Sequence, residues 1–142
     1  MNIKMKLIQG ALPLFCSKGL LGVSIRDICK TVDVSNATIN YHFQSKSHFI
    51  NECANGYFKT IKNGIATQGT TSKESLLSFF TKYKNEFKFL SFISLSTTGG
   101  QSDYLNMALG QILRNEKYQM TKKDLYSIFM ESILLEEENH SG

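Results

Sequence analysis

The stretch from Val23 to Lys46 constrains the fold of this chain most, because it carries two helix starts in close succession. Ser24 stands before an apolar periodic run and is followed in the first turn by Asp27, which is the pattern of a capped helix N-terminus. A second N-cap candidate, Ser35, opens the short segment from Asn36 to Phe43. The sequence therefore predicts two short helices joined by a tight turn.

The second of these helices is rich in small polar residues on the side that we expect to face solvent, whereas Ile39 and Phe43 are assigned to the core. Ser45 then caps a third, longer helix that begins at Lys46. A short helix, a tight turn and a second short polar helix form the helix-turn-helix pattern. The second helix of that motif enters the major groove of DNA.

This region resembles the tetracycline-repressor (TetR) family of bacterial transcription regulators. The resemblance runs from about Lys6 to Tyr57 and rests on four blocks in the order and spacing of the family. The blocks are ALPLFCSKG, SIRDI, VSNATINYHF, and QSK followed by an apolar position. It implies a DNA-binding head and a homodimer that reads a palindromic operator, most simply as a repressor. No resemblance is found beyond residue 60.

The resemblance also implies which residues meet DNA. Tyr41, His42 and Lys46 match phosphate-contacting positions, and Arg26 matches a position that reaches a base edge or a phosphate. Asn40 has the side chain to bind adenine, although the family more often carries an aromatic residue there and Gly at position 37, so no base preference is transferred. The alternatives are a solvated Arg26 and a His42 that packs on Phe43. The predicted DNA-binding set is Ser24, Arg26, Ser35, Asn36, Ala37, Thr38, Asn40, Tyr41, His42 and Lys46.

Charge is placed unevenly along the chain. Residues 1–46 hold six Lys or Arg and two Asp, whereas residues 47–142 hold ten residues of each sign, so the whole net charge of +4 lies in the first segment. Basic residues neutralise DNA phosphates, although a small basic face is often merely solvated. The distribution agrees with a DNA-binding domain over residues 1–46 and a helical dimerisation and effector-binding domain over residues 47–142.

Helical periodicity continues to the end of the chain, and no strand-period segment or internal repeat interrupts it. The sequence therefore predicts an all-α fold of about seven helices, with a three-helix head joined to a helical body. Gly19, which tolerates positive φ, ends the first helix. Outside the helix-turn-helix, the expected helices cover residues 3–18, 46–66, 73–96, 103–117 and 121–137.

The predicted body has fewer helices than is typical of the family, which puts a roomy ligand pocket in doubt. Aromatic residues that would line an effector site are Phe80, Tyr83, Tyr104, Tyr126 and Phe129, with a plain core role as the alternative. The last two helices are apolar on more than one side, and we expect them to form the dimer interface. The residues predicted for that interface are Leu105, Leu109, Ile112, Tyr126, Met130 and Leu134.

Several classes of protein are disfavoured. There is no apolar run of about 18 residues and no apolar signal region, so we expect a cytoplasmic protein without a membrane span. The three cysteines, Cys16, Cys29 and Cys53, give no disulfide or zinc spacing and suit buried thiols, with redox sensing as the alternative. The three histidines lack metal-site spacing, although His48 can approach Glu52 one helical turn away.

No cofactor motif and no catalytic set is found, so we expect no enzyme. Two rivals to a ligand-controlled repressor remain open. One is an adaptor or co-activator that keeps the head fold but acts through protein contacts. The other is a DNA-binding module without a small-molecule sensor. Salt-dependent duplex binding separates the first from a regulator, and a ligand melting screen separates the second.

Overall fold

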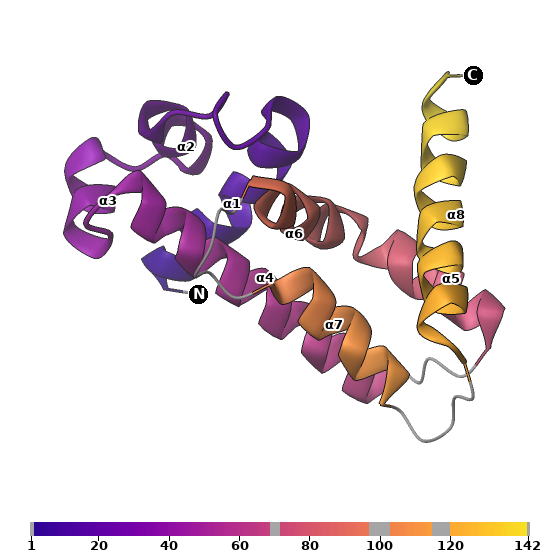
Figure 1. The fold of residues 1–142 in the computed structure, drawn as a ribbon. Helices are drawn as coiled ribbons and strands as arrows, with labels where there is room; N and C mark the ends of the chain where they lie inside the picture. Colours follow the sequence, from indigo (N-terminus) through magenta and orange to yellow (C-terminus); the bar gives the residue numbers. More distant parts are fainter. Residues whose placement is uncertain (1, 69–71, 97–102, 115–119, 142) are drawn as a thin grey trace.

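The computed structural model describes residues 2–68, 72–96, 103–114 and 120–141. These residues form eight α-helices and no strand, which confirms the all-α prediction. The helices are α1 (Ile3–Lys18), α2 (Ile25–Val32), α3 (Asn36–His42), α4 (Lys46–Gln68), α5 (Lys73–Lys82), α6 (Lys84–Ser96), α7 (Tyr104–Leu113) and α8 (Lys122–Ser141). As Figure 1 shows, α1 to α3 gather at one end, α4 runs from them with α7 beside it, and α5 and α8 lie at the other end.

The helix predicted over residues 73–96 is two helices, so the count of about seven becomes eight among the described residues. Tyr83 interrupts it with a φ of −105° and a ψ of 27°, and its N–H donates to the carbonyl of Phe79. The Tyr83 ring packs 4.9 Å from the Phe79 ring and lies against Gly64 of α4. The apolar pattern continues across the break, so periodicity alone does not reveal it.

The core of the head is formed by apolar side chains that recur once per turn on each helix. Leu7, Ala11 and Phe15 of α1 are fully buried, as are Ile28 of α2 and Ile39 of α3. Gly19 has a φ of 77° and its N–H donates to the carbonyl of Phe15, which confirms the predicted end of α1. These contacts orient α3 with its polar side away from the core.

Helix α6 attaches the head to the body. The ring of Phe89 on α6 packs 5.2 Å from Phe15 of α1 and 4.9 Å from Tyr57 of α4, between ring centroids. The Tyr57 hydroxyl donates to the carbonyl of Ile8, and the three rings are almost completely buried. We call Phe15, Tyr57 and Phe89 the joint cluster, because they connect three helices from both halves of the chain.

A second group of rings fills the far end of the body. Phe80 of α5, Phe87 of α6 and Phe129 of α8 have ring centroids 5.1 to 5.6 Å apart, and all three are buried. We call these residues the outer cluster. They hold α8 against the bend between α5 and α6.

Candidate nucleic-acid interface

The start of α2 is fixed by a reciprocal pair of hydrogen bonds. The Asp27 N–H donates to the Ser24 hydroxyl at 3.1 Å, and the Ser24 N–H donates to the Asp27 carboxylate at 3.0 Å, which confirms the predicted cap. These bonds lower the pKa of Asp27, because they stabilise its charged form. Arg26 lies in the same first turn and its side chain is exposed.

The turn into α3 depends on one left-handed residue. Asp33 has a φ of 61°, and the following N–H, of Val34, donates to the carbonyl of Cys29 at 3.0 Å. Asp tolerates this conformation better than most residues. Ser35 then caps α3 by accepting from the Thr38 N–H at 3.2 Å, as predicted. The two short helices and their tight turn therefore form a helix-turn-helix.

The structure brings the predicted DNA-binding residues to three places: the start of α2, the length of α3 and the start of α4. Ile39 of α3 and Phe43, which directly follows α3, are buried at 1% and 3% exposure, so the opposite side of the helix faces outwards. Exposed members of the predicted set are Ser24, Arg26, Ser35, Asn36, Ala37, Asn40 and Tyr41, and half-buried members are Thr38, His42 and Lys46. The His42 ring also lies 6.4 Å from the Phe43 ring, which is the packing named above as its alternative role.

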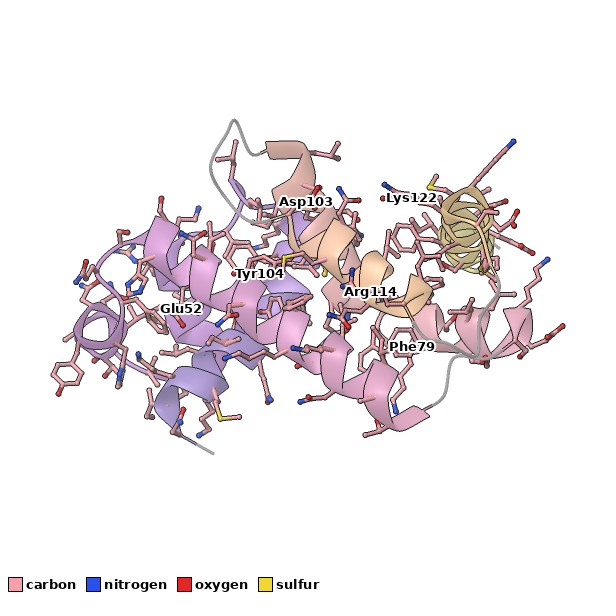
Figure 2. All side chains as sticks on the ribbon, turned by 60° about the horizontal axis from the view of Figure 1, so that its bottom comes forward. Glu52, Phe79, Asp103, Tyr104, Arg114 and Lys122 are labelled. Carbon is pink, nitrogen blue, oxygen red and sulfur yellow. The ribbon has the colours of Figure 1, made fainter. Side chains whose placement is uncertain are left out.

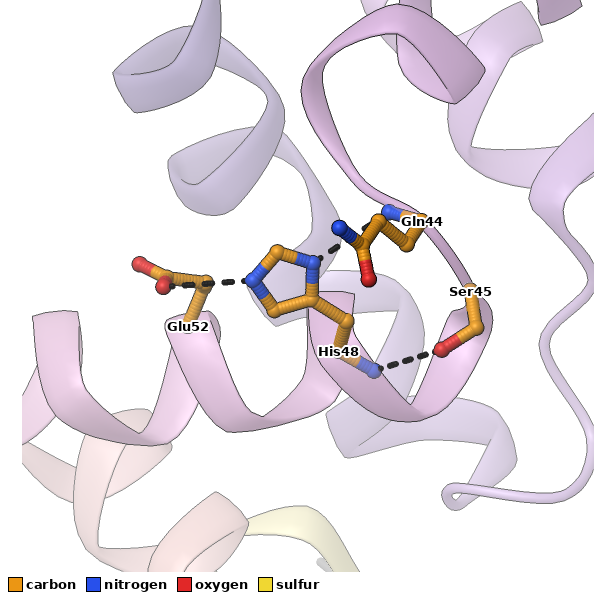
Figure 3. A network of polar contacts seen from close by, with 4 residues as sticks. All are labelled: Gln44, Ser45, His48 and Glu52. Atoms are coloured by element: carbon orange, nitrogen blue, oxygen red, sulfur yellow. Dashed lines mark hydrogen bonds and ion pairs between the residues drawn. The ribbon is translucent and has the colours of Figure 1, made fainter.

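A polar network closes the turn between α3 and α4 (Figure 3). The Gln44 N–H donates to Nδ1 of His48 at 3.2 Å, and the His48 N–H donates to the Ser45 hydroxyl at 3.1 Å. Nε2 of His48 lies 3.5 Å from the Glu52 carboxylate, which confirms the predicted contact. The bond between Gln44 and His48 was not predicted, although their spacing of one helical turn is a signal that could have suggested it.

The ring of Phe43 lies at the centre of this turn. Its centroid is 4.8 Å from the Phe49 ring and 5.9 Å from the His48 ring. Nζ of Lys4 on α1 lies 5.5 Å from the same centroid, close enough for a cation–π interaction. Sequence reasoning missed Lys4, because nothing in the spacing of residues indicates that the start of α1 meets the end of α3.

Comparison with known proteins identifies this head. Residues 7–53 match the family described as "Bacterial regulatory proteins, tetR family". The chain is 31% identical over 125 residues to the probable HTH-type transcriptional regulator YttP of Bacillus subtilis (strain 168). The head of this chain is a TetR-family domain. The match to YttP covers 82% of this chain and 60% of the length of that relative.

A second relative is the biofilm operon icaADBC HTH-type negative transcriptional regulator IcaR of Staphylococcus aureus (strain Newman). The two chains are 29% identical over 152 residues, which cover 92% of this chain and 81% of that relative. Both similarities extend beyond the helix-turn-helix into the body. The family resemblance found in the sequence is thus confirmed over residues 7–53, and the similarity to the two relatives covers more of the chain than the four blocks did.

The predicted effector residues in the body do not share one cavity. Phe80 and Phe129 line a groove of about 320 Å³ between α5, α6 and α8. Tyr104 instead packs 5.3 Å from Phe58, where α7 lies beside α4 (Figure 2), and the Tyr126 hydroxyl donates to the Asn106 side chain. The groove also takes side chains of α6 that were not predicted. Its full lining is Phe80, Thr81, Lys84, Asn85, Phe87, Lys88, Ser91, Phe92, Leu95, Phe129, Ser132 and Ile133.

The residues predicted for the dimer interface divide by exposure. Leu109 and Ile112 are buried within the chain at 2% and 1% exposure, because α7 packs on α4, so they offer no outer face. Leu105 and Tyr126 are half-buried. Met130 and Leu134 on α8 are 52% and 57% exposed. The exposed apolar side is therefore narrower than predicted and centred on α8.

The three cysteines are free. Burial raises the pKa of Cys16 to about 11 and that of Cys53 to about 12, and it also raises the pKa of Cys29. Within the described ranges, no three His, Cys, Asp or Glu residues form a group that could hold a metal ion. No helix in the described part of the chain is long and apolar enough to cross a membrane.

Proposed function

We propose that this chain is a transcriptional repressor whose residues 1–46 bind a palindromic DNA operator and whose residues 47–142 form a homodimer. The observation that carries the proposal is the outward polar side of α3, held rigid by buried Ile39 and Phe43. All of the excess positive charge lies in this head, where DNA phosphates would be met. IcaR, a relative over most of the chain, is named a negative regulator, which supports repression.

Duplex binding by substituted heads tests this proposal. Arg26→Ala and Asn40→Ala should each weaken binding to a duplex selected by the wild-type protein by ~1–3 kcal/mol, because each removes a base contact. Lys46→Ala should weaken all sequences alike and reduce the salt slope by about one. Lys59→Ala, an exposed lysine farther along α4, is the control. Unchanged affinity in the three head variants would remove this surface as the DNA-reading face.

The exposed apolar side of α8 supports the homodimer. Met130, Ile133 and Leu134 expose between 38% and 57% of their surfaces within two turns of one helix, an arrangement that often marks a partner surface. Met130→Glu together with Leu134→Glu should dissociate the dimer, because buried unpaired carboxylates are costly. Operator binding should then fall, since the two heads would no longer be linked. A persistent dimer on sedimentation would place the interface elsewhere.

The groove beside the outer cluster supports an effector site. Its volume of about 320 Å³ falls at the lower end of the range for small-molecule sites, and its floor consists of Phe80, Phe87 and Phe129. Because α6 also carries Phe89 of the joint cluster, an effector in the groove would act on a helix that contacts α1 and α4. A metabolite that raises the melting temperature of wild-type protein, and does so less for Ser91→Phe, would identify the site.

A further inference from the structure

A histidine side chain closes the turn between the recognition helix and α4. His48 is half-buried and reaches back over the exposed residues Gln44 and Ser45 (Figure 3). Its ring packs against Phe43 at an interplanar angle of 69°, with ring centroids 5.9 Å apart. Its Nδ1 accepts the Gln44 N–H at 3.2 Å. The backbone N–H of Gln44 therefore has a partner that depends on the state of one imidazole.

The hydrogen bond fixes the protonation state of that imidazole. A neutral imidazole has one donor and one acceptor nitrogen, and Nδ1 accepts only when it carries no proton. The proton then lies on Nε2, which faces the Glu52 carboxylate at 3.5 Å. A doubly protonated ring would point a second N–H at the N–H of Gln44, and the bond would be lost.

The position of this bond connects it to the DNA-binding face. Gln44 directly follows Phe43, whose N–H donates to the carbonyl of Ile39 at 2.9 Å and ends α3. Lys46, two residues later, begins α4. The bond from Gln44 to His48 therefore holds the spacing between the exposed side of α3 and the lysine that we expect to contact phosphate.

We propose that His48 is a positioning residue for DNA binding and that its protonation loosens the turn between α3 and α4. This inference rests on the proposed function, because it concerns the same DNA-binding face. The neutral ring holds α3 and Lys46 in one arrangement, and the charged ring releases Gln44. DNA affinity therefore carries a component that weakens when the imidazole gains a second proton in acid.

Three other charged or titratable groups lie near the ring or near its neighbour Phe43. Glu52, on the same helix, lies 3.5 Å from Nε2 of His48. Nζ of Lys4 on α1 lies 5.5 Å from the centroid of the Phe43 ring. The ring of His42 on α3 lies 6.4 Å from the same ring, and His42 belongs to the predicted DNA-binding set. The test therefore compares proteins that all retain His42.

The matched variant is His48→Asn, because its Oδ1 can stand near the position of Nδ1 and accept from Gln44 without titrating. The probe is a duplex selected from a random library by wild-type protein at about pH 8, and anisotropy is measured at about pH 8 and pH 5.5. The two proteins should bind within about twofold of each other at the higher pH. At the lower pH, wild type should bind about three- to tenfold more weakly than His48→Asn, since one hydrogen bond is lost.

A ratio of affinities that stays constant between the two pH values would overturn the inference. Failure of wild-type protein to select any duplex would instead overturn the proposed function, so the two failures are distinguishable. The amide resonance of Gln44 gives a readout that needs no DNA. It should shift between about pH 8 and pH 5.5 in wild-type protein and should stay unchanged in His48→Asn or His48→Gln, whichever retains the native melting transition. A Gln44 amide resonance that does not change with pH in wild-type protein would also overturn the inference.

Discussion

The joint cluster and the outer cluster are both built from three aromatic rings, but they differ in what surrounds them. Phe15, Tyr57 and Phe89 are covered by α1, α4 and α6. The outer cluster is buried too, yet it borders a groove of about 320 Å³ and a helix with exposed apolar side chains. The core where α1, α4 and α6 meet is therefore complete within one chain. The packing of α5, α6 and α8 instead leaves exposed apolar surface, of the kind that often marks a partner or ligand site.

Removing one ring from each cluster should give the largest effect. Phe→Ala substitutions in cores cost about 3–5 kcal/mol, and the cost grows with the cavity that remains. Phe89, fully buried, should lie at the upper end of that range, because its ring packs against both Phe15 of α1 and Tyr57 of α4. Phe129, 6% exposed beside the groove, should lie at the lower end, because α8 has room to settle. Urea unfolding measures both costs.

Leu21→Ala is the control for these two variants, since Leu21 is 98% exposed and should change stability by less than about 0.5 kcal/mol. Equal losses for Phe89→Ala and Phe129→Ala would contradict the comparison. That result would show that the outer half is packed as completely as the joint.

The same contrast explains how much of the molecule can be predicted from the sequence. Local sequence signals were enough to predict the helix starts of the head. Each predicted cap is present in the structure: Ser24 with Asp27, Ser35, and Ser45. The polar side of α3 followed once Ile39 and Phe43 were assigned to the core. These features depend on neighbours within one or two helical turns, so the sequence contains the information directly.

Features that depend on distant helices escaped prediction. The break at Tyr83 arises because α6 turns to pack on α1 and α4, and the apolar periodicity does not change there. Lys4 meets Phe43 only because α1 crosses the end of α3. Leu109 and Ile112 are likewise buried because α7 packs against α4. An apolar stripe reveals that a partner exists, but it does not reveal which helix that partner is.

Substitutions at two glycines, one in the head and one in the body, test the comparison with stability changes of intermediate size. A Cβ at Gly10 would lie 2.5 Å from a methyl of Val32, so Gly10→Ala should destabilise the head by about 1–3 kcal/mol through overpacking. A Cβ at Gly110 of α7 would approach Arg114 no closer than 3.4 Å, so Gly110→Ala should stabilise by about 0.5–1 kcal/mol through helix propensity. Thermal melting measures both changes. Adding Val32→Ala to Gly10→Ala should recover part of the lost stability, because it removes the methyl group that clashes. If stability does not recover, the loss in Gly10→Ala does not come from contact with Val32.

The smallest expected effect is a loss of stability of α2, relative to α5, at acid pH. Helix α2 is capped by Ser24 with the titratable Asp27, whereas α5 is capped by Ser72 with Ser75, which does not titrate. The folded chain lowers the pKa of Asp27 from 3.8, so its stabilising contribution is present above that value and is lost as the pH falls through the folded pKa. Amide exchange in α2 should therefore accelerate in acid relative to exchange in α5. Asp27→Asn should remove that difference, and equal acid sensitivity of the two helices in wild-type protein would refute it.

The burial of the native thiols has a practical consequence for labelling the chain and testing the proposed homodimer. Thiol reagents attack the thiolate, and the pKa values of about 11 for Cys16 and about 12 for Cys53 leave little thiolate at neutral pH. Cys16 also donates its S–H to the carbonyl of Asn85 at 3.3 Å, and Cys29 is buried. A cysteine introduced at exposed Lys59 would thus react first with a spin label or dye. In the proposed homodimer, the distance between the two labels could then be followed as DNA is added, with the three native cysteines left in place.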